Sequence, residues 1–129
     1  MALDIQIKKS LDPAQAGVVT VELGGSLDTA TAPELEQGLA PILAGDDLRQ
    51  LVFDLGQLRF ISSAGLRVFG LARRKLREAG GQVLFVHMQP QIEEVFEIIR
   101  ALPGLGVFRS VAELDEYLAA RQSRTRDDE

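Results

Sequence analysis

The chain has 129 residues, 46% of them hydrophobic, which is enough for one domain with a single core. It has no cysteine and one histidine, which excludes disulfides, thiolate metal sites and multi-histidine metal sites. Its formal net charge of −5 disfavours binding to nucleic acid or to an anionic membrane surface. The sequence shows neither a membrane-spanning run nor a signal peptide, so we expect a cytoplasmic protein.

The first half of the chain is expected to begin with two paired strands. Apolar and polar residues alternate over residues 3–8, and residues 18–23 are rich in β-branched side chains. Residues 31–34, Thr-Ala-Pro-Glu, have the pattern of a capping box, and apolar residues at helical spacing then predict a helix that ends at Gly45. The short apolar run at 51–55 indicates a buried strand.

The second half is expected to alternate helices with strands. We predict a helix from the serines at 62–63 to the glycines at 80–81, a buried strand at 83–86, a helix from Pro90 to Pro103, a short edge strand at Val107-Phe108 and a last helix from Ser110. This order predicts an α/β domain with a mixed, mainly parallel sheet of four to five strands and about four helices. We expect a single domain over residues 1–120 and a polar, frayed tail over 121–129.

The serines at the start of the second helix are the residues most suited to chemistry. Ser62 and Ser63 follow a buried strand, and functional sites in parallel sheets gather at the carboxyl ends of the strands. A helix start leaves backbone N–H groups without partners and carries partial positive charge, so a phosphate on a serine there would be stabilised. A serine in this position is also a common N-cap, and the local sequence alone favours that structural role.

The run from Leu51 to Arg77 resembles the signature of the anti-sigma factor antagonist family, whose fold is the STAS domain. In that family a strand ending in Asp-Leu or Asn-Leu precedes an aromatic residue, an apolar residue and a serine-rich helix start. The present chain has Phe-Asp-Leu at 53–55 and Phe-Ile-Ser-Ser-Ala-Gly-Leu at 60–66. Residues 25–28, Gly-Ser-Leu-Asp, resemble the family's Gly-Glu-Leu-Asp strand end, and the likeness covers about residues 3 to 119.

The resemblance implies a site for phosphorylation and partner binding. The family's phosphorylated serine lies two residues before the helix glycine, a position that Ser63 holds here, with Ser62 as the second choice. Ser62 occupies a place where the family often has aspartate. The acidic residues beside the switch serine would be Asp28 and Asp54. The implied partner surface comprises Asp28, Asp54, Ser62, Ser63, Ala64, Gly65, Leu66 and Arg67.

The family's mode of action implies a protein-binding switch and not an enzyme. An unphosphorylated member binds an anti-sigma factor that is also a serine kinase, and a sigma factor is thereby released. Phosphorylation of the serine ends the complex, and a serine phosphatase resets the switch. For this chain the resemblance implies a bacterial regulator of transcription that is a monomer or weak homodimer and needs no cofactor or metal.

Two other functions are compatible with the sequence. One is a STAS subunit of a stressosome or of a lipid-transport complex. The other is a small serine hydrolase, for which His87 could point to the same sheet edge as Ser63, although the Gly-x-Ser-x-Gly pattern is absent. Asp28 and Asp54 could also form a carboxylate pair for acid–base chemistry, but capping roles are more common for such residues.

Overall fold

A computed structural model describes residues 2–101 and 110–127 and contains one four-stranded sheet in this part of the chain. The strands are β1 (Leu3–Lys9), β2 (Val18–Leu27), β3 (Gln50–Ile61) and β4 (Gln82–Val86), adjacent in that order, and a short 3-10 turn (Pro13–Gln15) follows β1. β1 is antiparallel to β2, whereas β2, β3 and β4 are parallel. The prediction of a mixed, mainly parallel sheet is confirmed; the edge strand expected at Val107-Phe108 lies outside the described residues.

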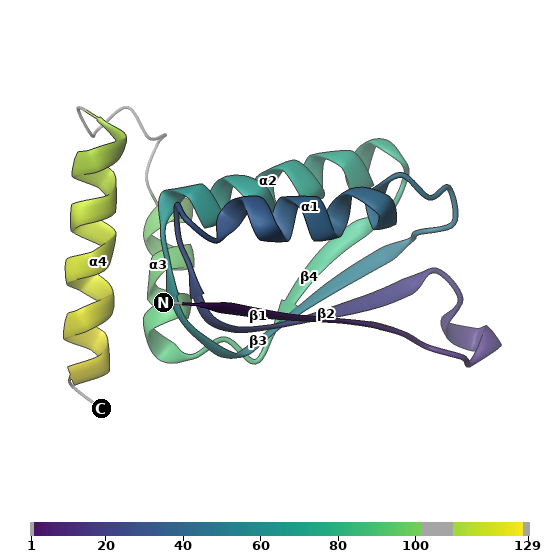
Figure 1. Cartoon of the computed structure of the whole chain (residues 1–129), viewed down its shortest axis with the longest axis horizontal. Coiled ribbons are helices and arrows are strands. Elements are labelled where there is room, and N and C mark those ends of the chain that lie inside the picture. The colour runs from purple at the N-terminus through teal and green to yellow at the C-terminus, as the bar shows by residue number, and fades with distance from the viewer. Residues whose placement is uncertain (1, 102–109, 128–129) are drawn as a thin grey trace.

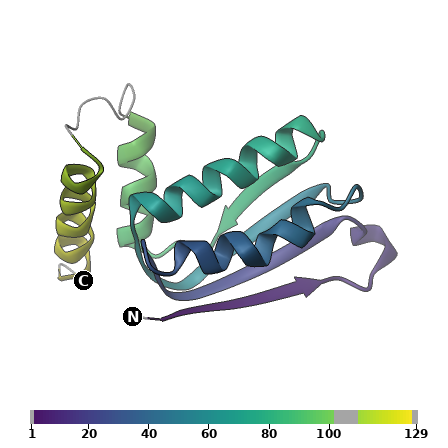
Figure 2. The ribbon, with the colours of Figure 1, turned by 45° about the horizontal axis from the view of Figure 1, so that its top comes forward.

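Two helices cover one face of the sheet, and two others lie at its end (Figures 1 and 2). The first pair is α1 (Ala32–Leu43) and α2 (Ser63–Glu78), and the second pair is α3 (Pro90–Ala101) and α4 (Val111–Asp127), which pack side by side. The polar tail expected at 121–129 differs in the structure. α4 continues to Asp127, and the side chain of Gln122 is buried against the end of the sheet.

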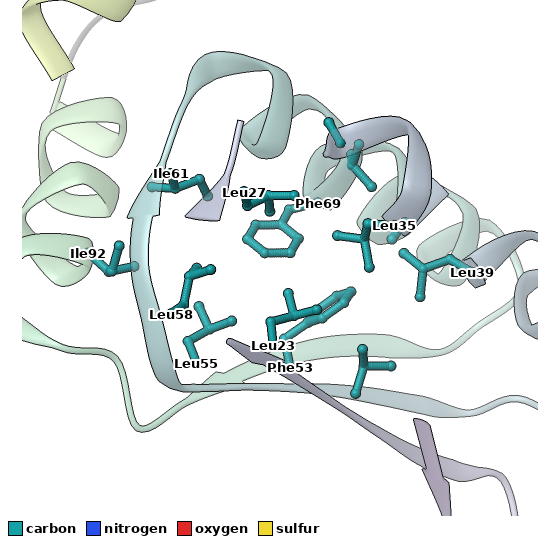
Figure 3. Packing of buried hydrophobic residues seen from close by; sticks show 14 of the residues in the cluster. Leu23, Leu27, Leu35, Leu39, Phe53, Leu55, Leu58, Ile61, Phe69 and Ile92 are labelled. Carbon is teal, nitrogen blue, oxygen red and sulfur yellow. The ribbon is translucent and has the colours of Figure 1, made fainter. Parts of the chain in front are cut away.

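The core lies between the sheet and the covering helices. Phe53 of β3 is fully buried, and its ring centroid lies 4.7 Å from that of Phe69 on α2 and 5.5 Å from that of Phe85 on β4. Farther along β3, Leu58 and Ile61 point into the same cluster as Leu27, whereas Ile92 of α3 lies on the other side of the strand (Figure 3). β3 therefore belongs to both parts of the core, and it positions α2 relative to α3.

β3 is longer than the sequence predicted. The expected strand at 51–55 continues without a break to Ile61, because residues 57–61 pair with the glycine-containing second half of β2, across two register irregularities. β4 pairs only with residues 50–54 of β3. The second half of β3 thus has one edge that no neighbouring described strand covers, and its backbone groups need other partners.

Three glutamine side chains supply hydrogen bonds along this edge. Gln89 Nε2 donates to the Gly56 carbonyl at 2.8 Å, and Gln91 Nε2 donates to the Arg59 carbonyl at 3.2 Å. The side-chain amide of Gln122 both donates and accepts at Ile61: it donates to the Ile61 carbonyl at 2.7 Å and accepts from the Ile61 N–H at 2.8 Å. An amide can pair with a backbone unit in this way because it carries both a donor and an acceptor. The contact from Gln122 fixes α4 to the last residue of β3.

Candidate functional site

The serine pair lies where two parallel strands end. The Ser62 N–H donates to the carbonyl of Leu27, the last residue of β2, at 2.9 Å, and Ser63 is the first residue of α2. Asp28 follows Leu27 directly and therefore belongs to the same edge of the sheet. The expectation that the serines mark the carboxyl end of the strands is met.

The two serines have different surroundings. The side chain of Ser62 is at the N-cap position of α2 but caps nothing: the residue is 5% exposed, and its Oγ has no hydrogen-bond partner among the described residues. Ser63 is half-buried. Its N–H donates to Asp115 Oδ1 at 2.8 Å, and its hydroxyl donates to Asp115 Oδ2 at 3.0 Å. Of the pair, Ser63 is therefore the serine whose hydroxyl lies outside the core.

Asp115 of α4 is a site residue that the sequence did not reveal. Its carboxylate receives the first N–H of α2, which is the role that a capping side chain usually performs from within the same helix. A carboxylate also suits the partial positive charge at this end of the helix. In the sequence, Asp115 follows the apolar Leu114 and precedes Leu118 by three residues, so it borders the apolar stripe of α4. That signal marks a half-buried acid but does not identify its partner.

The Asp28 side chain stabilises the turn that follows β2. Its Oδ1 accepts hydrogen bonds from the N–H groups of Ala30 and Thr31, each at 3.0 Å. The predicted capping box at Thr31 is wrong, because the threonine hydroxyl makes no capping bond to α1. Instead that hydroxyl is buried, donates to the Ser26 carbonyl at 2.8 Å and accepts from the Asp28 N–H at 2.9 Å. These bonds hold the turn between β2 and α1 and fix Asp28 next to the serines.

Asp54 does not lie beside Ser63, contrary to expectation. It is in the middle of β3, where its Oδ1 accepts from the Gly56 N–H at 3.0 Å and lies 3.1 Å from His87 Nδ1. Asp54 precedes Ile61 by seven positions, which is roughly 20 Å measured along a strand. The extension of β3 beyond β4 causes the difference. The same geometry keeps His87, just after β4, away from Ser63, which therefore has no histidine base. Because Asp54 lies so far back on β3, Asp28 and Asp54 also form no carboxylate pair.

The start of α2 contributes both buried and accessible residues. Gly65 is buried, and a Cβ built on it would lie 2.6 Å from Leu27 Cγ and 3.0 Å from Ile61 Cγ1, so this glycine permits close packing of α2 on the strand ends. Ala64 and Leu66 are half-buried, and Arg67 is exposed. Around the start of α2, the accessible part of the expected partner surface therefore consists of Asp28, Ser63, Ala64, Leu66 and Arg67, while Asp54 is half-buried farther back on β3.

Residues 2–101 and 110–127 contain neither a candidate metal site nor a candidate membrane span. No three histidine, aspartate or glutamate side chains in these ranges are grouped so that they could hold a metal ion. Nor does any helix in the same ranges combine the length and the apolar character needed to cross a bilayer.

Comparisons with known proteins converge on one family. The family model described as the STAS domain matches residues 11–114. BtrV of Bordetella bronchiseptica, named as an anti-sigma factor antagonist, is 40% identical over 82 residues, which cover 64% of this chain and 70% of BtrV. The anti-sigma-B factor antagonist of Staphylococcus aureus is 31% identical over 78 residues, which cover 60% of this chain and 71% of that protein.

Solved structures share the fold at lower sequence identity. The anti-sigma factor antagonist SpoIIAA in its unphosphorylated form superposes with a TM-score of 0.62 at 17% identity, covering 74% of this chain and 83% of SpoIIAA. An anti-sigma factor antagonist from Mycobacterium paratuberculosis gives a TM-score of 0.59 at 21% identity, covering 97% and 95% of the two chains. SpoIIAA has also been solved in its phosphorylated form, with a TM-score of 0.60 to this chain.

Proposed function

This chain belongs to the STAS domain family of anti-sigma factor antagonists, and we propose that it is a binding switch controlled by phosphorylation of Ser63. Unphosphorylated, it binds an anti-sigma factor that is also a serine kinase, and this binding releases a sigma factor for transcription. Phosphorylation ends the complex, and a serine phosphatase restores it. The switch operates in the cytoplasm and uses no cofactor. The observation that carries the proposal is the position of the Ser63 hydroxyl at the start of α2.

The choice of Ser63 over Ser62 as acceptor rests on burial. Ser62 is 5% exposed and its Oγ is buried, so a kinase could reach this hydroxyl only after the surrounding structure had moved. Ser63 is half-buried, and its hydroxyl bonds to a side chain of a neighbouring helix and not to the core. A phosphoryl group on Ser63 would lie at the positive end of α2, where an anion is stabilised by the helix.

Loss of the partner follows from charge at the docking surface. A phosphoryl group adds about −1.5 to −2 charges at neutral pH. The accessible residues around Ser63 include one carboxylate, Asp28, and one cation, Arg67, so the phosphoryl group would make this surface net negative. Like charges brought together at an interface can cost several kcal/mol. Phosphorylation would thus end binding without unfolding the sheet.

The direct test is to incubate the full chain with the cognate anti-sigma kinase and ATP and to measure its intact mass. We expect one added phosphate, which peptide mapping assigns to Ser63. Ser63→Ala should abolish the mass increase. Ser62→Ala is the matched control, because removing a buried hydroxyl that has no partner should leave the fold intact. Phosphate that persists in Ser63→Ala, or that is lost in Ser62→Ala, would contradict the assignment.

Partner binding tests the second half of the proposal. We expect Ser63→Asp to weaken capture of the anti-sigma factor by at least tenfold in a titration, since it places a permanent charge on the docking surface. Ser63→Asn has nearly the same shape without the charge, and it should retain most of the affinity. Equal binding by the two variants would show that charge is not what ends the complex. A stable large assembly on gel filtration would instead favour a stressosome-type subunit.

A further inference from the structure

We propose that α4 is a latch over Ser63, closed by Asp115 and opened when Ser63 is phosphorylated. In the closed state the Asp115 carboxylate holds both the N–H and the hydroxyl of Ser63. The kinase has to open the latch to reach the hydroxyl, and the added phosphoryl group then keeps it open. This inference rests on the proposed function in one respect, because it takes Ser63 to be the acceptor.

The closed latch and the phosphorylated serine are mutually exclusive. Asp115 Oδ2 lies 3.0 Å from Ser63 Oγ and is held there by the hydroxyl proton, which phosphorylation removes. The phosphoryl oxygens would occupy the space next to Oγ where the carboxylate now lies, and both groups are anionic. They would also compete for the one Ser63 N–H, which Asp115 Oδ1 now accepts at 2.8 Å. Two anions cannot share this donor and this space, so the carboxylate has to leave.

The remaining contacts of α4 decide which end of the helix opens when the carboxylate contact is lost. Its buried side chains are Leu114, Leu118 and Gln122, among the part of α4 whose side chains the structure describes. Arg121 adds an ion pair with Glu94 of α3. Asp115 lies close to the start of α4, whereas the bonds of Gln122 to Ile61 lie two turns farther on. We therefore expect the Asp115 end of α4 to open first.

Amide hydrogen exchange measures the state of the latch without a kinase. In the full chain, Ser63→Asp should speed exchange over residues 111–122 at least tenfold relative to the wild type, because two carboxylates then face each other. Ser63→Asn is the neutral control and should stay within threefold of the wild type. Ser63→Asp combined with Asp115→Asn should recover protection, since one of the two charges is gone. Wild-type protection in Ser63→Asp, or no recovery in the double variant, would overturn the latch.

Phosphorylation kinetics supply the second measurement. With the anti-sigma kinase and ATP, Asp115→Ala should raise the initial rate of Ser63 phosphorylation at least threefold, because the hydroxyl is no longer held. Glu116→Ala removes the same charge from the next, exposed position of α4 and should leave the rate unchanged. An unchanged or lower rate in Asp115→Ala would overturn the latch. If the wild-type chain accepts no phosphate, the proposed function fails, and hydrogen exchange still decides whether α4 responds to charge at position 63.

Discussion

Replacing Gly65 by alanine should destabilise the domain, although alanine is the better helix former. The new Cβ would lie 2.6 Å and 2.8 Å from Cγ and Cδ2 of Leu27 and 3.0 Å from Cγ1 of Ile61, and both neighbours are fully buried. Overpacking of this kind costs about 3 kcal/mol when the neighbours cannot move aside. Helix propensity returns at most about 1 kcal/mol. We therefore expect a net loss of about 2 kcal/mol in the free energy of unfolding.

Gly70 of the same helix provides the matched control. It is exposed, and a Cβ added there would meet no atom within 4 Å, so Gly70→Ala should stabilise the domain by about 0.5 to 1 kcal/mol. Urea denaturation followed by circular dichroism measures both variants, with the slope checked for a change in the unfolding transition. If Gly65→Ala is as stable as the wild type, or if the two variants shift in the same direction, close packing of α2 on the strand ends is not the reason for this glycine.

Two further substitutions test the polar contacts that hold the site. Gln122→Ala leaves the N–H and carbonyl of Ile61 without their partner, and we expect urea denaturation to show a loss of about 2 to 4 kcal/mol in the free energy of unfolding. The neighbouring Ser123→Ala is the control and should change that free energy by less than about 0.5 kcal/mol. A similar effect of both substitutions would refute the pairing of Gln122 with Ile61. Thr31→Val removes the hydroxyl that bonds to Ser26 and Asp28, so it should raise the hydrogen-exchange rate of the Asp28 amide. Thr31→Ser keeps the hydroxyl and should leave that rate unchanged. Equal exchange rates in the two variants would contradict the role of this hydroxyl in holding the turn.

The order of elements could be read from the sequence because it depends on local patterns. Alternating polarity in β1, apolar runs in β3 and β4 and helical spacing in α1 and α2 each lie within about a dozen residues. The serine motif is also local, since it combines a strand end and a helix start in one short run. Periodicity of this kind reports which face of an element is buried, and the sheet and the helix layer follow from it.

The length of β3 could not be predicted in the same way. Residues 56–60 include a glycine and polar side chains, and by themselves they are typical of a loop. They form a strand because the second half of β2 pairs with them on one side and glutamine side chains bond to them on the other. The mistaken placement of Asp54 and His87 beside Ser63 follows from this, since both were expected at the end of a shorter strand.

The chain by itself determined which serines begin α2 and which elements bring them to the edge of the sheet. Only the tertiary structure decided that Ser62 is buried and that Ser63 is hydrogen-bonded to Asp115, a residue 52 positions away. No local pattern encodes such a contact. The contact exists because α4 docks on the end of β3 that no described strand covers. This places the Asp115 carboxylate against the start of α2, whose N–H groups require an acceptor.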